Sequence, residues 1–196
     1  VNAVLASEDV PEVFVIDDEM DITMYRISYE MVSGNQGHWS DLSTEEISTV
    51  KDLMDTMIPT PSGCFIQGFS QWPLKSIGVE HLSGINLRQE EINWISTKLT
   101  GDVQQEALFS YLTELGCVLR PGFKYGCKWR VYDDDVAKSH APWLLQPMTE
   151  APVSWEQTCL SVRLAEGVHK KWVCGLKEDI GDWKFLHIKR WLPGRV

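Results

Sequence analysis

Hydrophobic and polar residues follow two spacings along this chain, and the first of them predicts strands. Runs rich in β-branched and aromatic residues, bounded by turn residues, are typical of strands. Such runs lie at residues 13–28 (two strands around an acidic turn), 64–69, around Ile77, and at 117–120, 127–132, 142–148, 170–176 and 183–191. The acidic hairpins near 13–28 and 172–191 resemble each other loosely, which hints at a duplication.

The second spacing is helical and predicts four helices, because apolar residues recur there on one face. The helices are expected within residues 43–58, 86–101, 103–116 and 154–168. In the first helix, Ser43 and Glu46 have the spacing of a capping box, and Pro59 closes it. The second and third end near Gly101 and at Gly116, because glycine favours the end of a helix.

This order of helices and strands predicts the α/β (α+β) class. The best boundary lies at Gly101 and Asp102, which gives an acidic N-terminal α/β domain (1–102) and a second domain (103–196). A chain of 196 residues with 43% hydrophobic and 23% charged residues can bury a core. The longest apolar runs are a few residues long, too short to span a membrane.

Charge is divided unevenly between the two halves. The formal net charge is −10, yet residues 1–103 carry five Lys or Arg against seventeen Asp or Glu, whereas residues 104–196 carry thirteen against eleven. An acidic chain argues against generic nucleic-acid binding, but a local basic face in the second half remains possible. The two halves are therefore expected to have different roles, with the acidic half serving structure or assembly.

The cysteines indicate an intracellular protein without a disulfide framework. They are odd in number and form no CxxC pair, so reduced and mostly buried thiols and no zinc site are expected. They are Cys64, Cys117, Cys127, Cys159 and Cys174.

Two short motifs contain residue types found in catalytic sites, but their spacing does not favour catalysis. Asp133, Asp134 and Asp135 could bind a divalent metal in a nuclease, but consecutive side chains point in different directions, so a solvated turn is favoured. Ser139 next to His140 could suggest a hydrolase, but neighbours in an extended segment face opposite ways. No GxSxG motif accompanies them.

Tyr132, His140 and a lysine of the sequence HKK (169–171) are individually weak signals but fit one reaction together. Cleavage of RNA by its own 2′-hydroxyl needs a base for the 2′-OH, an acid for the 5′-oxygen and a cation for the charge on phosphorus. Such a site needs no metal. Either Lys170 or Lys171 could be the lysine, and the spacing from Val168 favours Lys170.

Four motifs in the second half resemble the tRNA-splicing endonuclease (tRNA-intron endonuclease) family. They are LRPGFKYGCKWRVY (119–132), His140-Ala141 before an apolar strand, RLAEGVHK (163–170) and the final basic-aromatic HIKRW (187–191). The resemblance covers about ninety residues, so it implies a C-terminal mixed-sheet nuclease domain with flanking helices, restriction-endonuclease-like, for residues 103–196. The first half resembles the small N-terminal α/β domain of the family only roughly.

The resemblance implies a role for each residue of the triad. In the family the tyrosine is the general base, the histidine the general acid and the lysine the stabiliser of the transition state, which gives Tyr132, His140 and Lys170. A free phenol has a pKa of about 10 and is a weak base at neutral pH. The tyrosine would therefore need a cationic neighbour such as Lys170, or would mainly orient the 2′-hydroxyl.

The resemblance also implies RNA and protein partners. Arg163 and Trp191 match a pair that sandwiches a bulged base across the assembly, as stacking on arginine and aromatic faces allows. Glu178, Asp179 and Asp182 match an acidic loop that docks into a basic groove of another subunit. Without the resemblance, each of these would be a surface charge, a packing residue or a solvated turn.

The expected function is cleavage of precursor tRNA at exon–intron junctions by an intracellular oligomer, cytoplasmic or nuclear, without cofactors. One alternative is a non-catalytic structural subunit of the same enzyme. Another is an unrelated metal-dependent nuclease that uses Asp133 to Asp135.

Overall fold

A computed structural model describes residues 11–68, 71–102, 107–178 and 182–191. The chain forms two compact units, and each is considered by itself. The larger unit consists of Val1–Val32 and Leu119–Val196, and the smaller unit consists of Ser33–Val118. The larger unit is discontinuous in sequence, because its first strands come from the N-terminal end of the chain.

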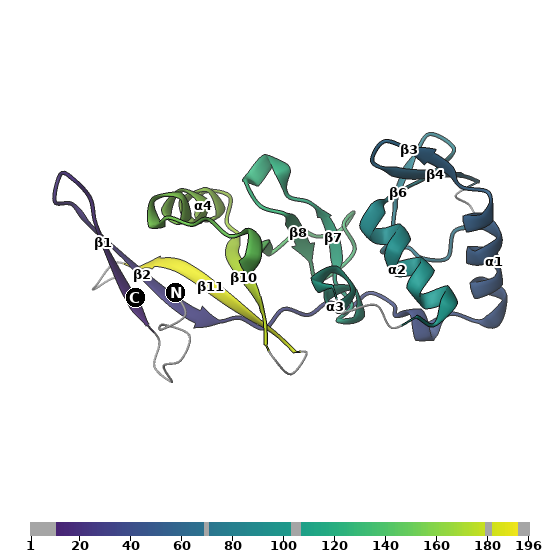
Figure 1. The fold of residues 1–196 in the computed structure, drawn as a ribbon, viewed down its shortest axis with the longest axis horizontal. Coiled ribbons are helices and arrows are strands. Elements are labelled where there is room, and N and C mark those ends of the chain that lie inside the picture. Colours follow the sequence, from purple (N-terminus) through teal and green to yellow (C-terminus); the bar gives the residue numbers. More distant parts are fainter. Residues whose placement is uncertain (1–10, 69–70, 103–106, 179–181, 192–196) are drawn as a thin grey trace. The chain divides into compact units, whose positions relative to one another are not determined.

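A seven-stranded sheet, ordered β1-β2-β11-β10-β9-β8-β7, forms the centre of the larger unit (Figure 1). The strands are β1 (Glu12–Ile16), β2 (Ile22–Tyr29), β7 (Val118–Pro121), β8 (Trp129–Tyr132), β9 (Trp143–Pro147), β10 (Lys171–Lys177) and β11 (Trp183–Trp191). The sheet is mixed, because β9 and β10 are parallel while β8–β9, β10–β11, β11–β2 and β1–β2 are antiparallel. Short 3-10 helices, η3 (Phe123–Tyr125) and η4 (Met148–Glu150), precede β8 and follow β9.

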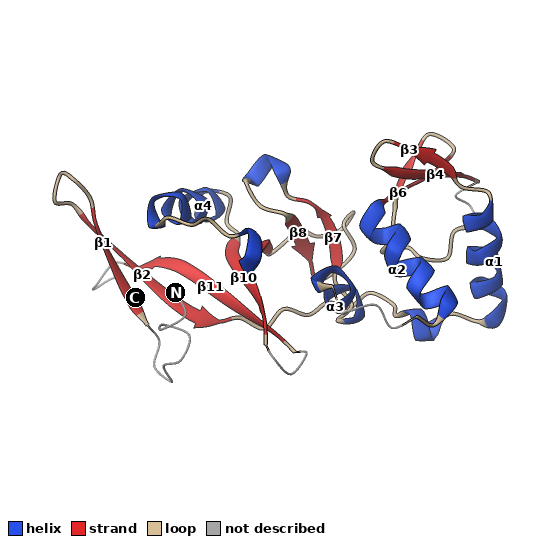
Figure 2. Ribbon diagram, in the orientation of Figure 1, coloured by secondary structure: helices blue, strands red, loops and turns tan. Residues whose placement is uncertain are grey.

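Helix α4 (Trp155–Gly167) makes the crossover that a parallel strand pair requires. Its N-cap is Ser154, whose hydroxyl accepts a hydrogen bond from the Gln157 N–H at 3.3 Å. The helix lies over one face of β10 and β11, as the ribbon in Figure 2 shows. This contact covers the sheet from one side.

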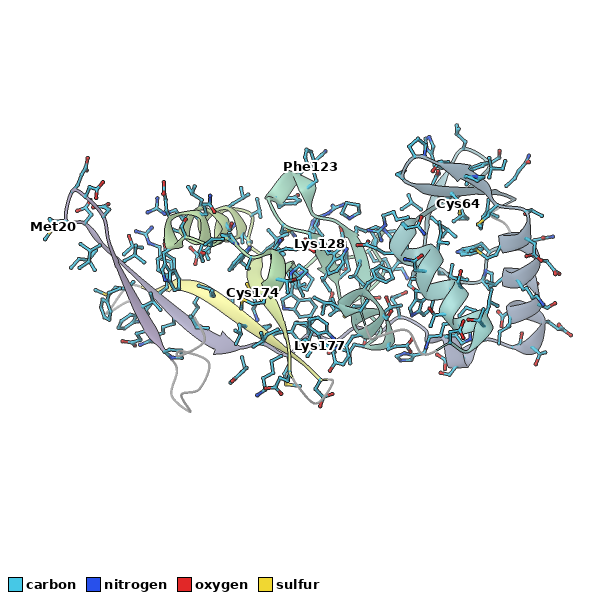
Figure 3. All side chains as sticks on the ribbon, viewed as in Figure 1. Met20, Cys64, Phe123, Lys128, Cys174 and Lys177 are labelled. Atoms are coloured by element: carbon cyan, nitrogen blue, oxygen red, sulfur yellow. The ribbon has the colours of Figure 1, made fainter. Side chains whose placement is uncertain are left out.

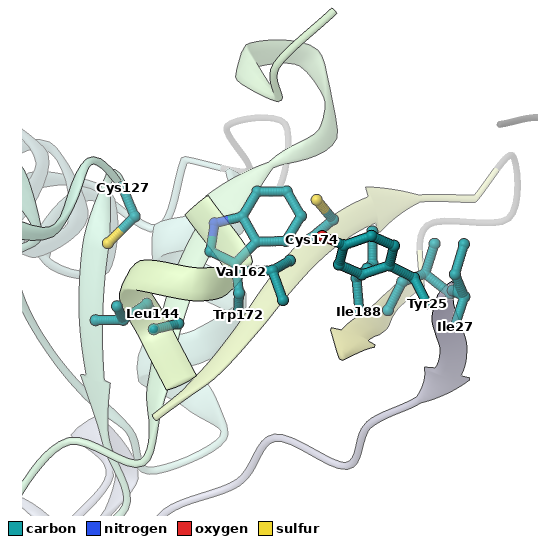
Figure 4. Packing of buried hydrophobic residues seen from close by; sticks show 10 residues of the cluster. Tyr25, Ile27, Cys127, Leu144, Val162, Trp172, Cys174 and Ile188 are labelled. Carbon is teal, nitrogen blue, oxygen red and sulfur yellow. The ribbon is translucent and has the colours of Figure 1, made fainter. Parts of the chain in front are cut away.

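The core of the larger unit lies between α4 and the sheet. Alternate residues of the strands point to the same face, and those facing α4 are apolar. Figure 4 shows Tyr25, Trp172 and Val162 in this core, where Tyr25 and Val162 are fully buried. The cluster also contains Ile27, Cys127, Leu144, Ala165, Cys174, Leu186 and Ile188. Because it joins β2 to the C-terminal strands, the N-terminal hairpin belongs to the same core.

The smaller unit combines three helices with a second sheet. The helices are α1 (Thr44–Asp55), α2 (Gln89–Thr100) and α3 (Leu108–Glu114), together with the 3-10 helix η1 (Trp39–Asp41). The sheet has the order β3-β4-β6-β5, from β3 (Ile58–Thr60), β4 (Gly63–Gln67), β5 (Val79–His81) and β6 (Gly84–Arg88). The predicted capping box is confirmed, since the Ser43 hydroxyl accepts from the Glu46 N–H and the Glu46 carboxylate accepts from the Ser43 N–H.

Most predicted elements are confirmed, with three differences in the smaller unit. The helix expected from residue 86 begins at Gln89, because residues 84–88 form strand β6. Helix α1 ends at Asp55, and Pro59 lies within β3 rather than directly after the helix. The stretch around Ile77 is a turn and not a strand, because the Trp72 indole N–H donates to the carbonyls of Leu74 and Ile77 and holds the backbone in a bend. Helix α2 ends as expected, with Gly101 in the left-handed conformation at φ 73°.

The compact units do not coincide with the division predicted from sequence after Asp102. The smaller unit continues to Val118, and Val1–Val32 belong to the larger one. The reason for the second difference is the pairing of β2 with β11, which runs from Tyr29 opposite Leu186 to Met24 opposite Trp191. This pairing makes β1 and β2 part of the larger sheet.

The two acidic hairpins have corresponding geometry. The Asp17 N–H donates to the Asp21 carbonyl, and the Glu178 N–H donates to the Asp182 carbonyl in the same way. When the two sequences are aligned so that Asp17 matches Glu178 and Asp21 matches Asp182, Ile27 matches Ile188. These two isoleucines are paired in the β2–β11 ladder. The hairpins are therefore related by a local two-fold axis through that pair. Met20, labelled in Figure 3, lies at the tip of the first hairpin.

All five cysteines are free thiols, and all except Cys159 are buried, as their spacing predicted. Burial raises the pKa of Cys174 to about 12, so this thiol is unreactive at neutral pH. Within the described parts of the chain, no helix is both long and apolar enough to cross a membrane.

Candidate active site

One edge of the large sheet gathers the predicted triad. Val131 lies opposite Trp143, and Trp143 lies opposite Lys171, so three adjacent strands are in register at this point. Because β8 is antiparallel and β10 parallel to β9, the end of β8 and the starts of β9 and β10 meet at the same edge. Tyr132 ends β8 and Lys170 precedes β10.

The three side chains differ in exposure. Tyr132 is only 6% exposed, and Lys170 is partly buried. His140 is exposed and lies in the loop that leads to β9. The loop turns at Asp135, whose carbonyl accepts hydrogen bonds from the N–H groups of Lys138 and Ser139. The structure therefore brings two fixed groups and one exposed histidine to one edge.

The structure distinguishes the two candidate lysines. The Lys170 ammonium donates to the carbonyl of Ala141, directly after His140, at 2.6 Å. The Lys171 ammonium instead lies 2.7 Å from the Glu30 carboxylate. Since alternate strand residues face opposite sides, Lys171 shares its side of the sheet with Trp143, away from α4. Lys170 is thus the lysine that contacts the His140 segment.

Electrostatics at this edge are dominated by two positive charges. The Arg130 guanidinium carbon lies 5.8 Å from the centre of the Tyr132 ring. Burial, and then the charge of Arg130, lower the pKa of Lys170 below its usual 10.5. The cation next to the tyrosine ring is therefore Arg130, which the sequence reasoning did not single out. Its position two residues before Tyr132 on a strand was the signal that could have identified it.

Within the described residues, no hydrogen bond, ion pair or ring contact joins Arg163 or Trp191 to Tyr132, His140 or Lys170. Arg163 is exposed on α4 and lines a cavity with Asp17, Asp18 and Asp21 of the β1–β2 turn. Trp191 ends β11, where the Arg26 guanidinium stacks 3.9 Å from its ring centre. In the sheet, β11, β10 and β9 separate β2 from β8.

The predicted docking loop is only partly described. Glu178 forms an ion pair with Lys184 across the turn, and Asp182 is exposed. Asp179 lies outside the described residues. The Glu178 carboxylate is therefore partly neutralised within its own hairpin.

The acidic run after Tyr132 forms a turn. The Asp134 carboxylate accepts from the Asp135 N–H at 2.7 Å, and the Asp135 carboxylate accepts from the Ala137 N–H at 2.9 Å. Lys138 pairs with Asp135 at 3.4 Å. In the residues that the structure covers, no group of three or more His, Cys, Asp or Glu side chains could hold a metal ion.

A network around Glu30 ties the N-terminal hairpin to the strands of this edge. The Glu30 carboxylate accepts from the Trp143 indole N–H at 3.0 Å and from the Lys171 ammonium at 2.7 Å. Burial alone would raise the pKa of Glu30, but these hydrogen bonds and the nearby positive charges lower it below its usual 4.5. Burial lowers the pKa of His187, which lies 3.9 Å from Glu30.

Comparisons with known proteins agree with the motifs. Residues 103–185 match the family model for the tRNA intron endonuclease, catalytic C-terminal domain. A tRNA-splicing endonuclease of Methanopyrus kandleri is 29% identical over 107 residues, which cover 53% of this chain and 59% of that protein. The resemblance inferred from the four motifs is thereby confirmed.

Two longer matches extend into the first half. A tRNA-splicing endonuclease of Thermoplasma volcanium is 27% identical over 177 residues, covering 90% of this chain and 54% of that protein. The Natronomonas pharaonis enzyme of the same name is 26% identical over 201 residues, covering 91% of this chain and 59% of that protein. The chain thus spans little more than half the length of these relatives.

The Glu30 network predicts a pH-dependent contribution to stability. A carboxyl with a lowered pKa stabilises the fold above its unfolded value and loses that effect as pH falls through the folded value. Glu30→Gln should therefore lower the free energy of unfolding by about 1 kcal/mol at pH 7. The difference from wild type should shrink as pH falls below 4.5. Urea unfolding at several pH values measures this.

The matched control is Glu12→Gln, which removes an exposed ion pair with Arg26 on the same hairpin. It should change stability by less than about 0.5 kcal/mol at either pH. A Glu30→Gln deficit that does not vary with pH would contradict the electrostatic explanation.

Proposed function

We propose that this chain carries the catalytic residues of a tRNA-splicing endonuclease, because residues 103–185 match the family model for the catalytic C-terminal domain of the tRNA intron endonuclease. It cuts precursor tRNA at exon–intron junctions of the bulge–helix–bulge type. The cut needs no metal and leaves a 2′,3′-cyclic phosphate and a 5′-hydroxyl. The observation that carries the proposal is that β8 ends at Tyr132 and β10 begins after Lys170 at the same sheet edge, where Lys170 donates to the Ala141 carbonyl next to His140.

Each residue has a role that suits its surroundings. Tyr132 accepts or orients the proton of the 2′-hydroxyl, and the Arg130 guanidinium lies beside its ring. His140 is exposed and gives its proton to the leaving 5′-oxygen. Lys170 is held by the Ala141 carbonyl and stabilises the negative charge that develops on the phosphate oxygens.

The same proposal includes partners. The chain acts inside the cell as part of a homo- or hetero-oligomer, in which the acidic loop docks on another subunit. Arg163 and Trp191 then contact the bulged nucleotide at a neighbouring site. This arrangement is supported by the lack of any contact, within the described residues, between Arg163 or Trp191 and the triad.

Cleavage of an intron-containing precursor tRNA in excess EDTA tests the reaction. Wild type should cut and leave cyclic-phosphate ends, while His140→Ala should lose at least about 10²-fold in rate and still bind, because only the general acid is removed. An all-DNA mimic, which lacks the 2′-hydroxyl, should remain intact. Cutting of the DNA mimic would refute the mechanism, and binding without any cutting would favour the structural-subunit alternative.

The two lysines should differ in their contribution to the rate. Lys170→Ala should lower kcat by about 10²–10³-fold, because it removes a cation at the reacting phosphate. Lys171→Ala removes an equal charge one residue away, where it pairs with Glu30, and should cost less than about 10-fold. Single-turnover rates of both variants measure the difference. The opposite order would assign the role to Lys171.

Charge reversal in the acidic loop tests assembly. Changing Glu178, Asp179 and Asp182 to Lys should weaken association, because the loop's partner groove is basic. Analytical ultracentrifugation should show a lower mass at the same concentration. The same reversal at Glu45, Asp52 and Asp55, which are exposed on α1, is the control and should leave the mass unchanged.

A further inference from the structure

Arg130 has a fixed position at the triad edge that the reaction described above does not use directly. Its Nε donates to the carbonyl of Pro121, the last residue of β7, at 3.1 Å. Its guanidinium carbon lies 5.8 Å from the Tyr132 ring centre, within the range of a cation–π contact. One nitrogen and one face of the guanidinium are thus engaged, which leaves the two terminal nitrogens available for a ligand.

Two basic side chains close in sequence to Arg130 and Lys170 are neutralised by carboxylates. Lys128, shown in Figure 3, forms an ion pair with Glu150, and Lys171 pairs with Glu30. In the described part of the chain, neither Arg130 nor Lys170 forms such a pair. The Lys170 ammonium contacts the Ala141 carbonyl, which carries no net charge.

These two cations also repel each other. The charge of Arg130, added to burial, disfavours the protonated form of Lys170 and lowers its pKa. Two like charges held together without a counterion form a site for an anion, because an anion relieves the repulsion and accepts charge-assisted hydrogen bonds. A guanidinium presents two parallel N–H groups, a geometry that matches two oxygens of a phosphate.

We propose that Arg130 binds a phosphate of the substrate RNA at this edge, together with Lys170. The proposal rests on the proposed function and adds a fourth residue to the site. Tyr132 lies two residues beyond Arg130 on β8, so the bound phosphate lies next to the base that receives the 2′-hydroxyl proton. Arg130 is then both the cation beside the Tyr132 ring and a ligand of the phosphate.

Arg130→Gln tests this role, because glutamine keeps an N–H donor for Pro121 but removes the charge. Lys128→Gln makes the same charge change two residues away, at a lysine that Glu150 already neutralises. With precursor tRNA, kcat/KM should fall by about 10²-fold for Arg130→Gln. It should change by less than about 3-fold for Lys128→Gln. Arg130→Lys, which keeps the charge without the paired N–H groups, should recover part of the loss.

Binding gives a second readout that does not depend on cleavage. The probe is precursor tRNA with a 2′-deoxy nucleotide at each cut position, which cannot be cut by its own 2′-hydroxyl. We compare the slope of log affinity against log salt concentration. For Arg130→Gln this slope should be smaller than in wild type by the equivalent of about one phosphate contact. Arg130→Lys should keep the wild-type slope, because the slope reports charge. A purely structural role would lower affinity without this pattern.

The cleavage and binding experiments together distinguish failure of this proposal from failure of the proposed function. If wild type does not cleave, the reaction is wrongly assigned, and the binding slope alone decides the role of Arg130. An unchanged slope and unchanged kcat/KM in Arg130→Gln would overturn the phosphate contact. Thermal melting should show that all three variants retain wild-type stability within a few degrees. Should Arg130→Gln melt early, Arg130→Lys supplies the same test through its rate.

Discussion

The parallel pairing of β9 and β10, with Lys171 opposite Trp143, is the constraint on which the active-site edge depends. Parallel strands need a crossover, so the chain must leave β9, form α4 over the sheet and return to the edge from which β9 began. The Lys170 N–H donates to the Ala165 carbonyl at the end of α4, and His169 takes a left-handed conformation at φ 55° to make the turn. The helix that closes the core therefore also delivers the lysine.

The local two-fold axis through Ile27 and Ile188 makes the two ends of the β2–β11 ladder alike in geometry, although different residues occupy them. The axis relates Glu30 to Trp191 and Arg26 to His187. It therefore relates two contacts to each other: Arg26 stacks on Trp191, and His187 lies beside Glu30. At one end of the ladder, β11 supplies the ring of Trp191. At the other end, Glu30 after β2 supplies a carboxylate that fixes Lys171 and Trp143. The first end suits an unpaired base, and the second holds protein strands together.

Local pattern predicted the elements because each depends on neighbouring residues. The Ser43–Glu46 cap, the acidic hairpins and the stop at Gly101 were all readable from spacing. Long-range pairing was not readable, since nothing in residues 13–28 specifies β11 as their neighbour. The contacts of Glu30 depend on that register. The triad positions came from the family resemblance, and the separation of Lys170 from Lys171 required the strand alternation seen in the fold.

The charge distribution of the chain explains why the proposed binding of RNA depends on a few cations at the active-site edge. A chain of net charge −10 repels RNA at long range, and four carboxylates line the same cavity as Arg163 beside the β1–β2 turn. Attraction must therefore come from positive groups that no carboxylate offsets, within about one Debye length of the phosphates. Arg130 and Lys170 meet that condition next to Tyr132, and their mutual repulsion is relieved only when an anion arrives. The same repulsion that costs the free protein some stability thus favours the bound state over the free one.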